Sequence, residues 1–67
     1  MTITVNDETQ SLENSSTLQD LLQSMGLIDK AGIAVAVNED VVTRTTWSDC
    51  ALNESDRVTI IQATQGG

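Results

Sequence analysis

Two short stretches at the start of the chain alternate apolar and polar residues. Residues 2–5 read Thr-Ile-Thr-Val, which has the period of two expected of a half-buried β-strand. Asn6, Asp7 and Glu8 supply polar turn residues, and residues 9–12 return as a second short strand. The pattern therefore predicts an N-terminal β-hairpin.

The period then changes to that of a helix. Four apolar residues have the three- and four-residue spacing of one helical face: Leu18, Leu21, Leu22 and Met25. Ser16 or Thr17 can cap the start of this helix, and Gly26 ends it. We interpret the apolar face as core rather than as a surface for a partner, because a domain this small needs its helix to cover the sheet. Leu27 and Ile28 are expected to close one end of that core.

The second half of the chain predicts three more strands. Residues 33–37 alternate β-branched residues with alanine, residues 41–44 form a short strand, and residues 57–62 form the last one. Trp47 and Leu52 are expected to pin the irregular segment around them against the domain. For Trp47, the only aromatic residue, we favour a core position over a role as a binding hot spot.

The order strand, strand, helix, strand, short strand, strand predicts an α+β fold. One main helix is expected to pack across a mixed sheet of four to five strands. The first and last strands should lie side by side, parallel through a right-handed crossover. The 67 residues contain no repeat and no linker, so residues 1–67 are expected to form a single domain of modest stability.

The charge of the chain restricts its partners. Ten acidic residues oppose Lys30, Arg44 and Arg57, which gives a formal charge of −7 at pH 7. This charge repels phosphate backbones and anionic lipids, so we expect neither nucleic acid nor membrane as a partner. It favours either docking to a basic enzyme surface or simple solubility, and both interpretations stay open. We expect Arg44 and Arg57 to relieve repulsion among nearby acidic residues rather than to pair with a partner.

Cysteine usage and hydropathy indicate a compartment. Cys50 is the only cysteine, so no internal disulfide can form, and a small domain without disulfides is typical of a reducing environment. No apolar run approaches the roughly 20 residues that span a bilayer, and no signal sequence precedes the first strand. We therefore expect a soluble, cytoplasmic protein.

Side chains for catalysis are scarce. The chain has no histidine and no tyrosine, so Cys50 has no histidine to activate it, and we disfavour a catalytic or persulfide role for it. The acidic pairs at residues 7–8 and 39–40 lack the spacing of a calcium loop, and no zinc ligands cluster. We therefore predict a protein that is not an enzyme and that binds no metal.

The chain ends in Gly66 and Gly67 after the apolar run of residues 58–61, which predicts a flexible tail over about residues 63–67. Because glycine has no side chain, such a tail can enter a narrow channel and bring the Gly67 carboxylate to a partner's reactive centre. A frayed terminus without function is the alternative.

Six short segments occur in an order and spacing that together are specific: Thr17-Leu18, Leu21-Leu22, Val35 to Asn38, Val42 to Arg44 with Trp47, Asp56 to Val58, and Gly66-Gly67. They resemble the ThiS family, the sulfur-carrier proteins of thiamine biosynthesis, over essentially the whole chain. The resemblance implies the ubiquitin-like β-grasp fold, which agrees with the architecture predicted from the pattern.

The resemblance also implies a mechanism. In the family, an E1-like adenylyltransferase, which is a ubiquitin-activating-like enzyme, uses Mg-ATP to adenylate the terminal glycine carboxylate. A sulfur donor system converts the acyl-adenylate to a thiocarboxylate, and thiazole synthase receives the sulfur. Carried over here, Gly67 bears both groups, Gly66 provides the slender approach, and the chain itself binds no cofactor.

Two positions depart from the family's usual pattern. Thr43 stands where the family often has proline, and Ser55 stands where it often has glycine. Both turns are therefore expected to be looser or differently shaped. Neither position touches the tail.

Three alternatives to a thiamine carrier stay open. The small subunit of molybdopterin synthase uses a similar tail, although it is usually longer and richer in aromatic residues. A ubiquitin-like modifier that joins lysines through isopeptide bonds would need the same diglycine end. The third alternative is a plain interaction domain whose tail has no function.

The last strand should also present an apolar patch. Val58 and Ile60 are expected to face the helix, which leaves Ile61 on the open side of the sheet beside Ala34 and Ala36. Exposed apolar patches mark interaction sites, so Ile61, Ala34 and Ala36 are candidates for docking a partner. The alternative is that Ile61 is tucked beneath the tail.

Overall fold

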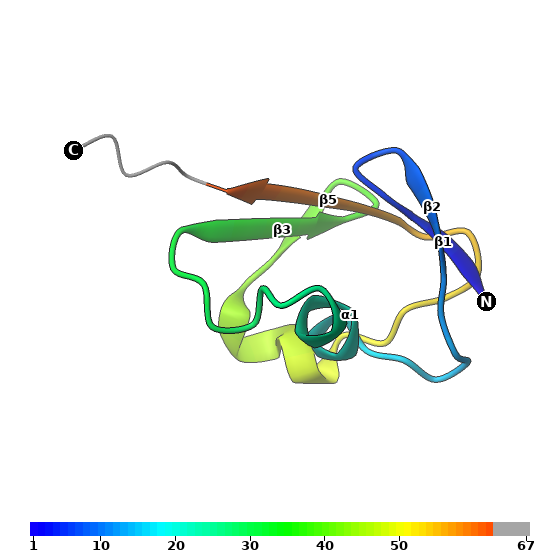
Figure 1. The fold of residues 1–67 in the computed structure, drawn as a ribbon, viewed down its shortest axis with the longest axis horizontal. Helices are drawn as coiled ribbons and strands as arrows, with labels where there is room; N and C mark the ends of the chain where they lie inside the picture. The colour runs from blue at the N-terminus through cyan, green and yellow to red at the C-terminus, as the bar shows by residue number, and fades with distance from the viewer. Residues whose placement is uncertain (63–67) are drawn as a thin grey trace.

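One mixed sheet and one α-helix make up most of the fold. The computed structural model describes residues 1–62, and residues 63–67 lie outside the described part. The sheet has five strands: β1 (Thr2–Val5), β2 (Glu8–Ser11), β3 (Ile33–Val37), β4 (Asp40–Val42) and β5 (Arg57–Gln62). The α-helix α1 spans Leu18–Ser24, and a 3-10 helix, η1, spans Arg44–Asp49. Figure 1 shows the sheet as one layer, with both helices on the same side of it, so the predicted α+β architecture is confirmed.

The strand order in the sheet is β2-β1-β5-β3-β4. β1 and β5 run parallel, with Thr4 paired to Arg57 and Val5 to Val58, whereas the other three neighbouring pairs are antiparallel. A parallel neighbour needs a long crossover, which the segment containing α1 provides. The first and last strands therefore lie side by side as predicted, and β5 lies at the centre of the sheet.

Both hairpins turn through two residues in the left-handed region. Four residues of these turns have positive φ: Asn6 (50°), Asp7 (69°), Asn38 (51°) and Glu39 (74°). Such turns match the right-handed twist of the strands, and asparagine tolerates the conformation well. Because the turns are this tight, β2 and β4 begin at Glu8 and Asp40, one residue earlier than predicted.

The strand predicted over residues 41–44 is wrong at its C-terminal end. β4 ends at Val42, Thr43 precedes η1 as its N-cap residue, and Arg44 is the first residue of η1. Thr46 stabilises this turn, because its backbone N–H and its hydroxyl both donate to the Thr43 carbonyl oxygen at 2.9 Å. These local bonds outweigh the strand tendency of the threonines.

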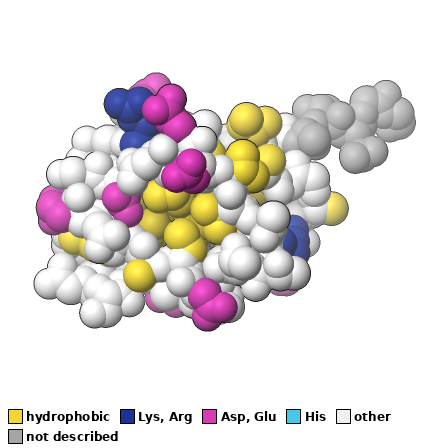
Figure 2. Space-filling model, turned by 180° about the vertical axis from the view of Figure 1, so that it is seen from behind, with side chains coloured by type: hydrophobic (Ala, Val, Ile, Leu, Met, Phe, Trp, Pro, Cys, Tyr) yellow, Lys and Arg dark blue, Asp and Glu magenta, His cyan; other side chains and the backbone are white. Residues whose placement is uncertain are grey.

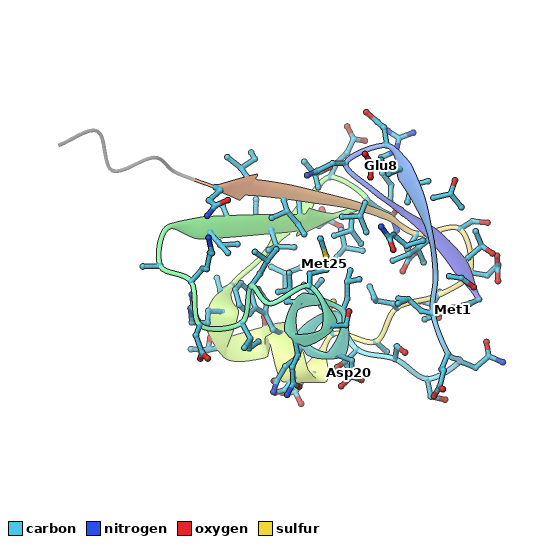
Figure 3. All side chains as sticks on the ribbon, in the orientation of Figure 1. Met1, Glu8, Asp20 and Met25 are labelled. Carbon is cyan, nitrogen blue, oxygen red and sulfur yellow. The ribbon has the colours of Figure 1, made fainter. Side chains whose placement is uncertain are left out.

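Thr17 caps the start of α1, as predicted. Its Oγ1 accepts from the Asp20 N–H at 3.2 Å, and Asp20 Oδ2 accepts from the Thr17 N–H at 2.9 Å. This reciprocal pair satisfies two backbone donors at the helix start, on the side of α1 that points away from the sheet (Figure 3). After the C-cap residue Met25, Gly26 takes a φ of 74°, which glycine adopts without strain. The chain leaves the helix there, in agreement with the prediction.

Nine apolar side chains form the core between the sheet and the helices. They are Ile3, Val5, Leu18, Leu21, Leu22, Val35, Trp47, Leu52 and Val58. Trp47 is 2% exposed and donates its indole N–H to the Val42 carbonyl at 3.0 Å, so its predicted core position is confirmed. Leu27 and Ile28 pack against this core. Met25 departs from the core position expected of it, because it is 40% exposed at the C-cap, where the chain turns out of the helix.

Alanine substitutions at Leu22 and Met25 should separate the core from its edge. Leu22→Ala should lower the free energy of unfolding by about 2 to 5 kcal/mol, because the side chain is fully buried and its removal leaves a cavity. Met25→Ala should cost less than about 1 kcal/mol. Urea unfolding followed by Trp47 fluorescence measures both values. Equal costs would contradict the placement of Met25 outside the core.

Candidate functional site

The face of the sheet opposite α1 is open to solvent. Along β5, Val58 is buried and Ile60 is partly buried on the helix side, whereas Thr59 and Ile61 lie on the open face. This is the alternation that the sequence predicts. Ile61 is 62% exposed, so one large aliphatic side chain faces solvent next to the end of the described chain.

Small and aliphatic residues surround Ile61 on this face. Ala34 pairs with Ile61 across the β3–β5 ladder, and Ala36 pairs with Thr59 on one side and with Val41 of β4 on the other. Val41 is 76% exposed. We call Ala34, Ala36, Val41 and Ile61 the apolar patch. Figure 2 shows hydrophobic side chains at the surface across the middle of the view, with one group that reaches the upper edge, where Figure 1 places the sheet.

Val41 is not among the docking residues predicted from the sequence, although the alternation of side chains along β4 places it on the open face. Val42 packs against the core, so its neighbour on a strand must point to the open face. The strand has only three residues and its two valines are adjacent. The alternation of apolar and polar residues is therefore not visible in the sequence.

The glycine tail follows directly from this face. β5 ends at Gln62, and Ile61 precedes Gly67 by six residues. Gly66, Gly67 and the whole tail predicted over about residues 63–67 lie outside the described residues. One residue of the apolar patch, Ile61, therefore lies on β5, the strand from which the tail continues.

A buried carboxylate fixes the opposite end of β5. Asp56 Oδ1 accepts from Asn38 Nδ2 at 2.9 Å, and Asp56 Oδ2 accepts from the Asn53 N–H at 2.8 Å. Asn38 Oδ1 in turn accepts from the Arg57 N–H at 3.0 Å. This network ties the β3–β4 turn to the first residue of β5, and it helps to set which residues of β5 face outwards.

The two turns that depart from the family pattern have backbone angles that proline and glycine would also adopt. Thr43 has a φ of −73°, within the range that proline would impose, and Ser55 has a φ of 71°, which glycine would adopt freely. The Ser55 turn is closed by a hydrogen bond from the Asp56 N–H to the Asn53 carbonyl at 3.1 Å. The expectation that both turns are looser or differently shaped than in the family stays a prediction.

Arg44 is held by the protein itself. Its Nη1 and Nη2 donate to the carbonyl oxygens of Ile28 and Lys30 at 2.8 and 2.7 Å. Its guanidinium carbon lies 4.8 Å from the centre of the Trp47 ring, which adds a cation–π contact. Arg44 thus clamps the loop after α1 onto η1, a role that the sequence did not predict.

Cys50 is a half-buried residue at the end of η1. Burial raises the pKa of its thiol, and the negative charge of Asp56 raises it further. A thiol that stays protonated is a weak nucleophile, which argues against a sulfur-handling role for Cys50.

The acidic residues and the cysteine, which could bind a metal ion, are also dispersed. Within residues 1–62, no group of three or more His, Cys, Asp or Glu residues could hold a metal ion. None of the helices in this part of the chain is long and apolar enough to cross a membrane. The absence of a bound metal and of a bound cofactor stays a prediction.

Comparisons with known proteins agree with this arrangement. The chain matches the ThiS family over residues 1–67. It is 28% identical over 67 residues to the sulfur carrier protein ThiS of Escherichia coli (strain K12), and the match covers 100% of both chains. It is also similar to the crystal structure of a thiamine biosynthesis protein (ThiS) from Geobacter metallireducens, with a TM-score of 0.84, 22% identity and 100% of both chains covered. A solution NMR structure of a thiamine biosynthesis protein from the same species gives a TM-score of 0.78 at 22% identity, over 100% of this chain and 88% of that one.

The fold and these matches define the class of protein. A mixed five-stranded sheet with one helix across it is the β-grasp fold, and the solved structures support that fold. The class is that of small carrier proteins, which are not themselves catalysts. The chain belongs to the ThiS family, so the resemblance seen in the sequence is confirmed.

Alkylation of Cys50 by iodoacetamide should be slow in the folded chain. Because burial raises the pKa of the thiol, the thiolate fraction at about pH 8 is lower than for an exposed cysteine. We expect a lower rate than in the urea-unfolded chain, measured by mass spectrometry over time. The native rate should rise with pH and keep rising above the ordinary value of 9.0. Equal rates in the two states would contradict this environment for Cys50.

Proposed function

We propose that this protein is a sulfur carrier of thiamine biosynthesis that holds its sulfur as a thiocarboxylate on Gly67. The match to the ThiS family over residues 1–67 carries the proposal, because it includes both terminal glycines. The name of the Escherichia coli relative, sulfur carrier protein ThiS, supports it.

The proposed chemistry takes place in two steps at Gly67. A terminal carboxylate with an ordinary pKa of about 3.5 is ionised at pH 7 and resists nucleophilic attack. An E1-like activating enzyme would join this carboxylate to the AMP part of Mg-ATP and release pyrophosphate. A sulfide equivalent from the sulfur donor system would then displace AMP and leave a thiocarboxylate, from which thiazole synthase takes the sulfur.

The partners supply the catalysis in this proposal. The chain has no histidine, and its one cysteine has a raised pKa, so it lacks a pair of groups that could activate the carboxylate. A chain without disulfides that serves such enzymes would work in the cytoplasm.

The apolar patch would be the surface that these enzymes contact. Val41 and Ile61 are 76% and 62% exposed on the same face as Ala34 and Ala36, and contiguous exposed apolar residues mark interaction sites. Ile61 also lies close in sequence to the tail, so an enzyme that holds the patch is near the carboxylate it must reach. Ile61, Ala34 and Ala36 thus keep the docking role expected of them, and Val41 joins them.

The relatives favour thiamine biosynthesis over the other uses of a diglycine tail. A stable complex with the large subunit of molybdopterin synthase, but not with thiazole synthase, would favour that enzyme instead. Lysine-linked conjugates recovered from cells would favour a protein modifier.

Deletion of Gly67 should abolish thiocarboxylate formation and leave the fold intact. The chain is incubated with the activating enzyme, ATP and the sulfur donor system of its organism, and intact mass spectrometry reads the replacement of one oxygen by sulfur. The full-length chain should gain this mass and the shortened chain should not, because its carboxylate ends one residue short.

Cys50→Ser is the matched control for this experiment. It removes the other sulfur-bearing candidate and leaves the tail unchanged, so it should be converted as well as the natural chain. Conversion of the shortened chain, or failure of the full-length chain to convert, would overturn the proposal.

Ile61→Asp should weaken docking without unfolding the protein. Placing a charge in the apolar patch should raise the KM for activation by about tenfold or more, whereas the exposed position should leave stability nearly unchanged. Ser48→Asp adds the same charge on η1, on the other side of the sheet, and should leave KM within about twofold. Steady-state activation at varied carrier concentration measures both, and equal KM values for the two variants would exclude the patch as the docking surface.

A further inference from the structure

The open face has a cationic end as well as an apolar one. The outward residues of β5 are Arg57, Thr59 and Ile61, and alternate residues of a strand lie about 7 Å apart. Arg57 and Ile61 therefore lie about 13 Å apart in one row. Because β5 leads into the tail, the apolar end of the row is near the tail and the cationic end is distant from it.

Arg57 is the basic residue of this face. Of the three basic residues in the chain, Arg44 is bound to two carbonyl oxygens on the helix side of the sheet. Lys30 lies in the loop that Arg44 holds against η1. Within residues 1–62, no carboxylate oxygen lies within 4.0 Å of the Arg57 guanidinium and no group accepts a hydrogen bond from it. Its charge is therefore available to a partner.

A small concavity adjoins the Arg57 side chain. It is lined by Asn38, Glu39, Ser55 and Arg57 and has a volume of about 250 Å³. Asn38 Oδ1 accepts from the Arg57 N–H, and Asn38 Nδ2 donates one of its two hydrogens to Asp56. The donors that remain are the Arg57 guanidinium, the Ser55 hydroxyl and the second hydrogen of Asn38 Nδ2, which suit a carboxylate. The volume is smaller than that of a pocket for a drug-sized ligand and is appropriate for one side chain of a partner.

We propose that Arg57 orients the carrier on its activating enzyme by pairing with a carboxylate of that enzyme, while the apolar patch contacts an apolar surface beside it. This inference rests on the proposed function, since it assigns the docking contact of the same tail. It differs from the role in charge relief that the sequence suggested for Arg57, which stays a prediction.

The charge distribution explains why one cation would matter. A formal charge of −7 attracts a basic surface from a distance, but attraction spread over ten acidic residues does not select one rotation of the carrier. A guanidinium among these acids is repelled by a basic surface and is stabilised only where an acid lies opposite it. One carboxylate placed about 13 Å from the apolar contact would therefore select a single orientation.

A change at Glu39 tests whether the group that binds beside Arg57 is negatively charged. The Glu39 carboxylate lines the same concavity and repels an incoming carboxylate. Glu39→Gln should therefore lower the KM for activation about twofold when Arg57 is present. The same change should have no such effect when Arg57 is replaced by glutamate, because the partner's carboxylate no longer binds there.

The main experiment compares Arg57→Glu with Lys30→Glu. Each change replaces one positive charge by one negative charge, so both lower the net charge by the same amount. ATP–pyrophosphate exchange by the activating enzyme of the same organism is measured at varied carrier concentration. Arg57→Glu should raise KM by about tenfold or more with kcat within about twofold, whereas Lys30→Glu should change KM by less than about threefold. Thermal unfolding by circular dichroism confirms that both variants are folded.

The outcomes separate the two proposals. If the natural chain supports no exchange, the proposed function fails and this inference fails with it. If the natural chain is active but Arg57→Glu and Lys30→Glu raise KM equally, only the inference is overturned, because the effect is then one of net charge. If an acidic residue of the enzyme changed to arginine restores the KM of Arg57→Glu but not that of Lys30→Glu, the pairing is established.

Discussion

The pairing of β5 with a strand on each side is the constraint on which the rest of the structure depends. Val58 pairs with Val5 of β1 in parallel and with Val37 of β3 in antiparallel register, and it is fully buried. Because side chains alternate along a strand, this one buried residue sets the phase of β5. A slip by one residue would carry Ile61 toward the core and Val58 into solvent, so the apolar patch exists only in the native register.

Two polar residues hold this register where the short parallel ladder ends. The Asn6 N–H donates to the Val58 carbonyl at 2.9 Å, and Asn6 Oδ1 accepts from the Ile60 N–H at 2.8 Å, so the ladder continues beyond β1 through a side chain. At the other end, the Asp56 carbonyl accepts from the Thr4 N–H at 3.0 Å, while its carboxylate is buried in the turn. Asn6 Oδ1 and both carboxylate oxygens of Asp56 accept hydrogen bonds from the protein itself, so these atoms hold the register of β5.

The period of apolar residues was sufficient to predict the elements that bury one face. It was insufficient to predict the elements that are held by residues distant in sequence. The strands, α1 and the outward position of Ile61 follow from the alternation of apolar and polar positions. The 3-10 helix does not, because it is stabilised by the burial of Trp47 and by bonds from Arg44 to carbonyls 14 and 16 residues away. Met25 has the spacing of a core residue, and Gly26 marks the helix end correctly, but neither signal shows that the side chain of the C-cap residue is left 40% exposed. Val41 was missed because two adjacent valines conceal which one faces the core.

A carrier that passes between enzymes must bind each of them and then leave. Nine buried side chains form the core of residues 1–62, so in the proposed function a partner would meet the surface and the tail. If the apolar patch is the docking surface, its two alanines, one valine and one isoleucine would form too small a contact for a permanent complex, since transient interfaces bury less than about 1,200 Å². Such a contact releases readily but orients poorly, because apolar surfaces attract without direction. A single guanidinium at the far end of the same strand would add direction at little cost in release, which is the balance that the proposed transfer of a reactive tail requires.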